Sequence, residues 1–420
     1  MTTPRTAGGS TLRRFTKKAA RAAANKLRAY GAGTPDGFDL AAVPSADIAL
    51  YFPDTPSRLY QLTQWLPVFE ANKEMRTIVV VRSTETYNHL QGITSLRVLL
   101  VPRYEAMMAM YDRADFHAVV YVNNGWTNFQ SLSFQQAVHI HVNHGESDKI
   151  CMVSNQAKAY DKVFVAGEAA VRRHAAALAW FDPSHLVRVG RPQLDLPVPS
   201  AVPAFVGPTI TYAPTWEGED DANNYTSVDR YGPRIIAAAL AQPGARVLYK
   251  PHPRVVNSRD EGVARGHAEI VRLMEQAQAG NPAHAVLLQG DMLGVIRDTD
   301  LMIADVSSVT LDHLYLRPDA PIALCDRRSN RDQLLDDAPV AAGAHIVDAT
   351  SIASLTDDLA AMLADDHLRD KRLELRDFYF DGLAPGQSTE RFWTELKTAI
   401  HYHDAALRDL SRVRIVEETA

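Results

Sequence analysis

The stretch LMIADVSSVTLDHLYL, residues 301–316, holds in one place the pattern that decides the fold. Four apolar residues and Asp305 predict a buried strand, Ser307 and Ser308 follow it, and apolar residues at helical spacing then predict a helix. The same alternation of short apolar runs and helix-length segments recurs along the chain. The runs that we expect to be strands are 47–52, 77–82, 97–101, 118–123, 138–143, 162–167, 186–190, 209–213, 246–250, 285–289, 301–305, 321–325 and 345–349.

Runs that are apolar on both faces and separated by helices are typical of parallel strands covered on both sides. We therefore expect an α/β protein with two Rossmann-like, doubly wound parallel sheets that face each other across a cleft. Four prolines between 192 and 203 interrupt the alternation and predict a domain boundary there. The expected domains are 38–200 and 205–385, with an N-terminal segment 1–37 and a C-terminal helical segment 386–420.

Composition and charge exclude several classes of protein. The 420 residues are 46% hydrophobic and 22% charged, which suits two globular domains. No run approaches the ~20 apolar residues of a membrane-spanning helix. Two isolated cysteines fit a reducing cytosol, and no apolar signal-peptide core is present, so export is not expected. The net charge is −6, and its uneven distribution, a basic N-terminal segment on an acidic remainder, argues against a general nucleic-acid binder.

The basic charge is concentrated at the N-terminus. Residues 1–30 carry eight basic residues and no acidic one, so the remainder carries −14. The alanine-rich segment 11–30, free of glycine and proline, predicts a helix. We expect this basic helix to contact an anionic membrane surface, because each basic residue near such a surface contributes ~1 kcal/mol. The alternative is a solvated tail.

A histidine follows the predicted strand 138–143. Ligands of doubly wound sheets bind beyond the carboxyl ends of the strands. His144 occupies such a position, and Gly145 allows a ligand to approach closely. An imidazole there can accept a proton from an alcohol near neutral pH, although a loop histidine bonded to backbone is the alternative. His139 and His141 share one face of the strand, where we expect them to be packed.

Polar residues also follow two strands in the second half of the chain. Thr215 comes just after 209–213, and Lys250, His252 and Arg254 follow the next strand. His252 lies between two prolines, which restrict its backbone and suit a side chain of fixed geometry. Three basic groups so close together favour a phosphate site. The hydrophilic segment 217–224 predicts a solvated loop, with part of an acceptor site as the alternative.

The quoted stretch 301–316 offers a fourth position of this kind. Ser307 and Ser308 at a helix start form a capping signature, and backbone N–H groups there also favour an anion. Asp312 would face back toward that end. Residues 298–300 have the DxD form of some metal-dependent sugar transferases, but they precede the strand, so we expect no metal there. No complete GxGxxG follows a strand, and no GxxxxGK[ST] or HExxH occurs.

Taken together and in order, these segments resemble the CDP-glycerol glycerophosphotransferase family, the teichoic-acid polymerases and primases of bacterial cell walls. The motifs that carry the resemblance are His144-Gly145 with Lys149, Gly190-Arg191-Pro192 with Asp195, Tyr212-Ala213-Pro214-Thr215-Trp216, Lys250-Pro251-His252-Pro253, and Asp305-Val306-Ser307-Ser308-Val309 with Asp312. They extend over about 139–326. The chain departs from the family pattern at Glu146, Arg191, Glu217 and Val306.

The resemblance implies a GT-B fold in which 38–200 is the acceptor domain and 205–385 the CDP-donor domain. It implies transfer of glycerol phosphate, or another polyol phosphate, from a CDP-alcohol to a hydroxyl of a lipid-linked or polymeric cell-wall acceptor, with release of CMP. No metal and no cofactor would be needed. The protein would be cytoplasmic and peripheral to the inner face of the membrane.

The same resemblance assigns roles to the residues. His144 would be the catalytic base and His252 would steady the donor pyrophosphate. The donor and phosphate site would comprise Ser307, Ser308, Asp312, Lys250, Arg254 and Thr215, supported by Gly145, Lys149 and Asp305. A GT-B glycosyltransferase that uses a nucleotide sugar on a cell-surface polymer is the alternative, and a non-catalytic polymer-binding protein is a third hypothesis. The sequence leaves the polyol, the acceptor and a homo-oligomeric state open.

Overall fold

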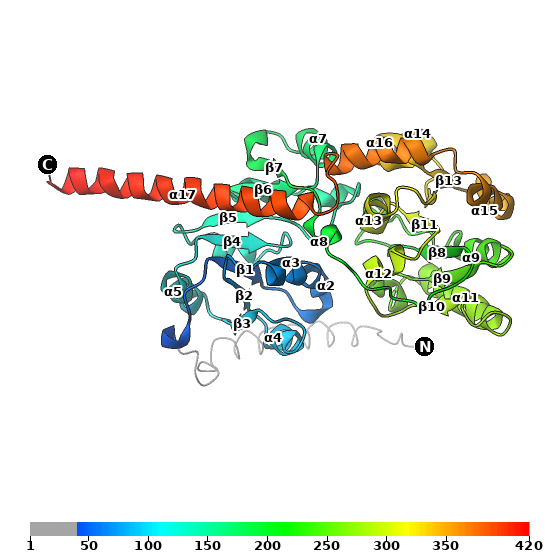
Figure 1. Cartoon of the computed structure of the whole chain (residues 1–420), viewed down its shortest axis with the longest axis horizontal. Helices are drawn as coiled ribbons and strands as arrows, with labels where there is room; N and C mark the ends of the chain where they lie inside the picture. Colours follow the sequence, from blue (N-terminus) through cyan, green and yellow to red (C-terminus); the bar gives the residue numbers. More distant parts are fainter. Residues whose placement is uncertain (1–39, 420) are drawn as a thin grey trace, which may run out of the picture. The chain divides into compact units, whose positions relative to one another are not determined.

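The computed structural model describes the backbone of residues 40–419 and the side chains of 40–149 and 151–410. The predicted basic helix 11–30 lies outside the described residues. All thirteen predicted strands are confirmed. Figure 1 shows the strands and helices alternating along the chain. Their bounds are β1 Ile48–Phe52, β2 Thr77–Val81, β3 Arg97–Leu100, β4 Ala118–Tyr121, β5 Val138–His141, β6 Lys162–Val165, β7 Leu186–Arg188, β8 Thr209–Ala213, β9 Arg246–Tyr249, β10 Ala285–Val286, β11 Leu301–Asp305, β12 Ile322–Cys325 and β13 His345–Val347.

The strands form the two parallel sheets that the sequence predicts. The first sheet has the order β3-β2-β1-β4-β5-β6-β7, and the second has the order β10-β9-β8-β11-β12-β13. Every pairing that the structure describes is parallel. The expected α/β class with two doubly wound sheets is therefore confirmed. Each sheet changes its direction of growth once, between β1 and β4 in the first and between β8 and β11 in the second.

Helices connect the strands. In the first part of the chain they are α2 Tyr60–Thr63, α3 Leu66–Ala71, α4 Thr84–Leu90, α5 Tyr104–Ala114, α6 Asn128–Ser131, α7 Glu168–Ala177 and α8 Pro192–Asp195. In the second part they are α9 Gly232–Leu240, α10 Pro253–Val256, α11 Glu261–Gln278, α12 Met292–Ile296, α13 Ser308–Leu316, α14 Arg331–Asp337, α15 Leu355–Ala364, α16 Arg369–Phe380 and α17 Gln387–Thr419. Helix α17 confirms the helical C-terminal segment. No helix in the described part of the chain has the length and apolarity required to cross a bilayer.

The described residues form two compact units. Unit 1 comprises the residues up to His139 and those from Ile400 onward, and unit 2 comprises Ile140–Ala399. The first turns of α17 thus belong to unit 2 and the later ones to unit 1. The domain boundaries expected from the sequence, at 37, 200 and 385, remain predictions.

Two apolar cores cover the faces of the second sheet. On β11, Met302 and Ala304 belong to one core, while Leu301 and Ile303 belong to the other. Side chains of successive strand residues point to opposite faces, so this division follows from the pleat. The first core also includes Ala169 of α7. Within unit 2, this core therefore packs the last part of the first sheet against the second sheet.

Gly190, in the Gly-x-Pro motif, occupies a position that only glycine fits. Its φ of +73° lies in the left-handed region, and a Cβ there would overlap Ser388 Oγ and lie 2.7 Å from Leu383 Cδ1. Gly244 has a similar φ of +69°, but apart from its chain neighbours no atom of the described residues lies within 4 Å of the position that a Cβ would take. A substitution of Gly244 therefore introduces backbone strain alone, whereas a substitution of Gly190 introduces both backbone strain and steric overlap.

We expect Gly190→Ala to lower the free energy of unfolding by roughly 2–5 kcal/mol, because a left-handed residue other than glycine costs ~1–2 kcal/mol and overpacking adds ~1–3 kcal/mol. Gly244→Ala, the matched control, should lose only the strain contribution. Chemical denaturation of both variants measures the difference. Equal losses would show that the packing of α17 against this turn contributes nothing.

Candidate functional site

The carboxyl ends of β8, β9 and β11 come together at the point where the second sheet changes direction. Thr215 follows β8, and its backbone N–H donates to Asp305 Oδ2, 2.8 Å away at the end of β11. His252, which follows β9, donates its backbone N–H to the carbonyl of Pro214 at 3.0 Å. The structure therefore places Thr215, His252 and Asp305 at one edge of the sheet, as the sequence predicts.

The segment after β5 reaches the same place. Lys149 Nζ donates to Thr215 Oγ1 at 2.7 Å and lies 5.6 Å from the centre of the Tyr225 ring. Burial lowers the pKa of Lys149, while the charges of Cys151 and Asp305 raise it. Thr215 thus links the motif that contains His144 to the end of β11.

His252 is held in one orientation. It occupies the N-cap position of α10, where Nδ1 accepts the backbone N–H of Arg254 at 3.2 Å. Its ring is stacked on Trp216, with centroids 6.1 Å apart and an interplanar angle of 29°. Since Nδ1 is an acceptor, the neutral ring carries its proton on Nε2, which is then a donor.

The charge state of His252 follows from its surroundings. Burial lowers its pKa to about 3, and the charges of Lys149, Arg254, His144 and Lys250 contribute to this shift. The imidazole is therefore neutral at physiological pH. Because His144 is among the contributing groups, the two predicted catalytic histidines lie close enough to interact electrostatically.

The two other predicted basic residues also have protein partners. Lys250 is buried and donates to the carbonyl of Gln289 at 3.3 Å. Arg254 is exposed, lies 4.0 Å from the centre of the Trp216 ring, and pairs with Glu219 at 3.1 Å. These contacts bring the predicted solvated loop 217–224 beside α10. Both cations nevertheless act on His252, so they contribute positive potential to the site.

The start of α13 lies where the sequence predicts it, but the Ser307 side chain does not cap it. Ser307 occupies the N-cap position with extended backbone, yet its side chain makes no capping hydrogen bond. Its Oγ is buried and has no hydrogen-bond partner among the described residues. The capping signature in the sequence is therefore not used for capping. The Ser307 hydroxyl thus directly precedes the first N–H groups of a nine-residue helix, which have no acceptor within the helix.

Gly145 lies against this helix start. A Cβ built on Gly145 would lie 3.3 Å from Ser308 Cβ and 3.4 Å from Arg191 Nη1. Arg191 in turn pairs with Asp312 at 2.9 Å, and both side chains are buried. Burial raises the pKa of Asp312 to about 6, against the guanidinium of Arg191, which lowers it. Asp312, predicted to face the helix start, thus orients Arg191, a residue at which this chain departs from the family pattern.

A buried network behind the His144 segment was not predicted from the sequence. Arg173 on α7 pairs with Glu146 and, at 2.6 Å, with Asp148. Tyr379 on α16 donates to the other oxygen of Asp148. Burial raises the pKa of Asp148 to about 7, against the Tyr379 hydroxyl, which lowers it. Glu146 is therefore not directed at a substrate; it anchors the loop that carries His144 and Lys149.

Other predicted residues have structural surroundings. His139 contacts the Tyr121 hydroxyl at 2.8 Å and the Phe134 carbonyl at 2.6 Å, and His141 stacks on Tyr160, so both are packed as expected. Asp300, in the DxD segment, accepts from the Thr209 N–H at 2.9 Å. Within residues 40–419, no three His, Cys, Asp or Glu side chains are arranged to hold a metal ion.

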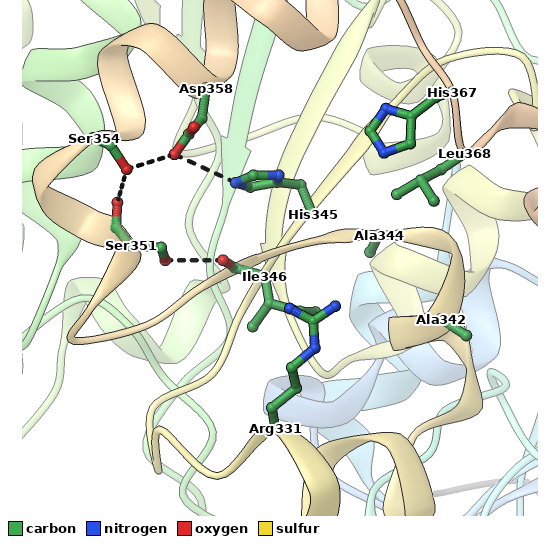
Figure 2. Close-up of a pocket in the computed structure, with 10 residues that line it drawn as sticks. All are labelled: Arg331, Ala342, Ala344, His345, Ile346, Ser351, Ser354, Asp358, His367 and Leu368. Carbon is green, nitrogen blue, oxygen red and sulfur yellow. Dashed lines mark hydrogen bonds and ion pairs between the residues drawn. The ribbon is translucent and has the colours of Figure 1, made fainter.

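Unit 2 contains one cavity beside the candidate site and another away from it. One of about 140 Å³ adjoins the site and is lined by Asp148, Tyr225 and Val306, together with residues of the β12–α14 segment. The other, of about 350 Å³, lies beside β13 and contains no predicted site residue. Figure 2 shows His345 in this second cavity, directed toward Asp358, 3.4 Å away. The second cavity is therefore separate from the predicted site.

Comparison with solved structures agrees with this fold. A variant of the wall teichoic acid polymerase TagF, soaked with CDPG, aligns over 93% of this chain and 99% of its own, with 14% identity and a TM-score of 0.56. A UDP-GlcNAc 2-epimerase from Neisseria meningitidis, bound to UDP-GlcNAc, aligns over 84% of this chain and 99% of its own, with 10% identity and a TM-score of 0.54. A glycosyltransferase from Rickettsia africae aligns over 85% and 99%, with 12% identity and a TM-score of 0.52. At such identities the likeness shows the GT-B fold alone.

Comparison of the sequence is more specific. No curated protein matches the chain. The model of one protein family does match, over residues 70–396, and this range contains every motif at the edge of the second sheet described above. The match covers well over half of the chain, and it agrees with the resemblance inferred from the motifs. The chain belongs to the CDP-glycerol:poly(glycerophosphate) glycerophosphotransferase family.

Proposed function

We propose that this protein transfers glycerol phosphate, or another polyol phosphate, from a CDP-alcohol to a hydroxyl of a lipid-linked or polymeric acceptor and releases CMP. The observation that carries the proposal is the meeting of the family motifs at one edge of the second sheet. Lys149, Thr215 and Asp305 form a continuous chain of contacts there, beside His252 and the start of α13. Phosphoryl transfer depends mainly on positioning and charge stabilisation, which such a cluster supplies.

The donor phosphates fit the start of α13. The Ser307 hydroxyl has no hydrogen-bond partner among the described residues, and it lies beside the first N–H groups of the helix. The positive end of the helix dipole and the cations Lys149, Lys250 and Arg254 favour an anion in the same region. Neutral His252 would donate from Nε2 to a phosphate oxygen. These groups would neutralise the pyrophosphate without a divalent metal.

His144 would act on the acceptor. The acceptor hydroxyl oxygen attacks the phosphorus that bears the polyol, its proton passes to His144, and the bond from that phosphorus to the CMP oxygen breaks. CMP leaves with the electron pair of that bond, so atoms and charge balance. Arg173, Glu146 and Asp148 would fix the position of the His144 loop during this step.

We also propose that the protein is cytoplasmic and associates peripherally with the inner face of the membrane through residues 11–30. The eight basic residues within 1–30 support this proposal, since their attraction to anionic lipid accumulates over the segment. A lipid-linked acceptor would be reached from such a position.

The proposal predicts CMP release from CDP-glycerol or CDP-ribitol in the presence of EDTA, and none from nucleotide sugars. His144→Ala and His252→Ala should each lower turnover by roughly 10²–10⁴-fold, the first through loss of general acid–base catalysis and the second through loss of a hydrogen-bond donor to the phosphate. His367→Ala, which removes a histidine from the second cavity, is the matched control. A chromatographic assay of the released nucleotide measures all of these rates.

Three outcomes would contradict the proposal. Release of a nucleoside diphosphate from a nucleotide sugar would support the glycosyltransferase alternative. Near-normal rates in both histidine variants would overturn the assignment of His144 and His252. Loss of activity in EDTA, restored by a divalent cation, would overturn metal independence alone.

The donor KM should depend on pH through Asp305. Burial raises the pKa of Asp305 to about 7, against hydrogen bonds from Ser227 and Thr215 and the charge of Lys149. Below this pKa the Asp305 carboxyl is neutral. Above it the carboxylate, which accepts the Thr215 N–H, is negatively charged and repels the donor phosphates. We expect the wild-type KM for CDP-glycerol to rise roughly three- to tenfold between about pH 6 and about pH 8.5.

Asp305→Asn keeps this position neutral at every pH, so its KM should stay nearly level over the same range. Asp377→Asn removes an exposed carboxylate on α16 and should keep the wild-type profile. Steady-state kinetics at the two pH values make the comparison. An Asp305→Asn profile as steep as that of the wild type would assign the pH dependence to another group.

Deletion of residues 1–30 should leave turnover with a soluble acceptor intact and weaken binding to anionic vesicles by at least tenfold, given ~1 kcal/mol per basic residue. Cosedimentation with vesicles of phosphatidylglycerol and phosphatidylcholine measures the binding. Neutral phosphatidylcholine vesicles are the control. Equal binding of the full chain and the deleted chain to anionic vesicles would exclude this segment as the membrane contact.

A further inference from the structure

The first sheet has its own change of direction, between β1 and β4, and polar side chains gather there as they do in the second sheet. Both strands belong to unit 1, and they pair in register from Ile48↔Ala118 to Tyr51↔Tyr121. Asp54 follows β1 by two residues and Asn123 follows β4 by two residues. Ligands of doubly wound sheets bind at this kind of position, and the donor site proposed above does not use it.

The polar groups form a connected set. Asn123 Nδ2 donates to Asp54 Oδ2 at 2.8 Å and to Gln61 Oε1 at 2.9 Å, and Asn123 Oδ1 accepts the Gly125 N–H at 3.1 Å. Arg58 lies 3.6 Å from the other oxygen of Asp54. Asn123 thus fixes a carboxylate and an amide oxygen side by side, with a guanidinium next to them. Oxygen acceptors beside an N–H donor are the groups that bind neighbouring hydroxyls.

An exposed aromatic side chain adjoins this set. Trp126 is 80% exposed, and the neighbouring Gly125 packs so closely that a Cβ there would lie 3.4 Å from Asp54 Oδ2. The indole lies 5.7 Å from the ring of Phe129, centre to centre. An indole face with polar groups beside it binds a ligand with both apolar and hydroxyl faces.

The loop that carries Trp126 is fixed although its indole is exposed. Tyr51 OH donates to the Thr127 carbonyl at 3.3 Å, Asn128 Nδ2 donates to the Asn123 carbonyl at 2.7 Å, and Arg82 donates to Gln130 Oε1 at 2.8 Å. A fixed loop lowers the entropy cost of binding. The exposure of Trp126 is therefore a feature of an ordered surface.

We propose that this edge of unit 1, formed by Asp54, Gln61, Arg58 and Trp126, binds a hydroxyl-rich unit of the acceptor, a polyol or a sugar. The proposal rests on the proposed function, since it supplies that reaction's acceptor subsite. Trp126 would stack on the carbon face of the unit, and Asp54 and Gln61 would accept its hydroxyl protons.

The first experiment measures binding without donor or turnover. Isothermal titration of the full chain with a short oligo(glycerol phosphate), and separately with an N-acetylhexosamine disaccharide, distinguishes a polyol from a sugar ligand. Trp126→Ala should weaken binding of the preferred probe roughly tenfold, which corresponds to about 1.4 kcal/mol, and Asp54→Asn by a similar factor. Trp180→Ala, which removes a fully exposed indole from unit 2, is the matched control and should bind like the wild type.

The Trp126→Ala variant should fold like the wild type, because truncation of an exposed indole leaves the core intact. Thermal unfolding of each variant checks that it is folded. Equal probe binding by Trp126→Ala and wild type would overturn the proposal. So would a Trp126→Ala variant that keeps probe binding but loses binding to phosphatidylglycerol vesicles, since the indole would then contact lipid.

The second experiment separates this inference from the proposed function. With CDP-glycerol as donor, Trp126→Ala should raise the KM for the oligomeric acceptor roughly tenfold and keep the wild-type KM for CDP-glycerol. A rise in the donor KM alone would overturn the acceptor subsite. If neither the wild type nor the Trp126→Ala variant releases CMP from any CDP-alcohol, the proposed function fails. The titration still decides whether unit 1 binds hydroxyl-rich ligands.

Discussion

The hydrogen bond from Lys149 to Thr215 is the contact on which the candidate site depends. Lys149 follows the fifth strand of the first sheet, and Thr215 follows the first strand of the second, so the bond joins segments 66 residues apart. Thr215 passes the connection to Asp305 through its backbone N–H. Burial lowers the pKa of Lys149 and raises that of Asp305, so it disfavours both charges, and each charge stabilises the other when it is ionised.

The surroundings of this contact explain why the loop tolerates an acidic residue. Glu146 and Asp148 are buried, and two carboxylates there would be costly without a cation. Arg173 on α7 pairs with both of them. The departure from the family pattern at Glu146 is thus balanced by a partner on a neighbouring helix. Arg191 and Asp312 form a second pair of this kind, next to Gly145.

The sequence predicted the positions of the strands, because short apolar runs separated by helix-length segments are typical of parallel sheets. It also predicted that the candidate site residues follow the carboxyl ends of these strands. The motif positions at His144, Thr215, His252 and Asp305 followed from that fold and from the family pattern. The Arg173 network could not be predicted, since it includes a hydrogen bond between residues 231 positions apart and no local spacing marks its members. The sequence also left two interpretations of Ser307 open, because a capping sequence does not show whether the hydroxyl itself caps the helix. The cluster at Asp54 and Trp126 lies before the motifs and was visible only once β1 and β4 were paired.

The membership of α17 in both units bears on how the chain is made. Its residues from Ile400 onward belong to unit 1, where Asp404 pairs with His117 at 2.9 Å. A ribosome therefore synthesises the whole of unit 2 before it delivers the last part of unit 1. Domains generally fold in the order in which they emerge, but here the earlier unit waits for the later one. The surface of unit 1 that this helix covers therefore stays uncovered until translation has passed the end of the second sheet.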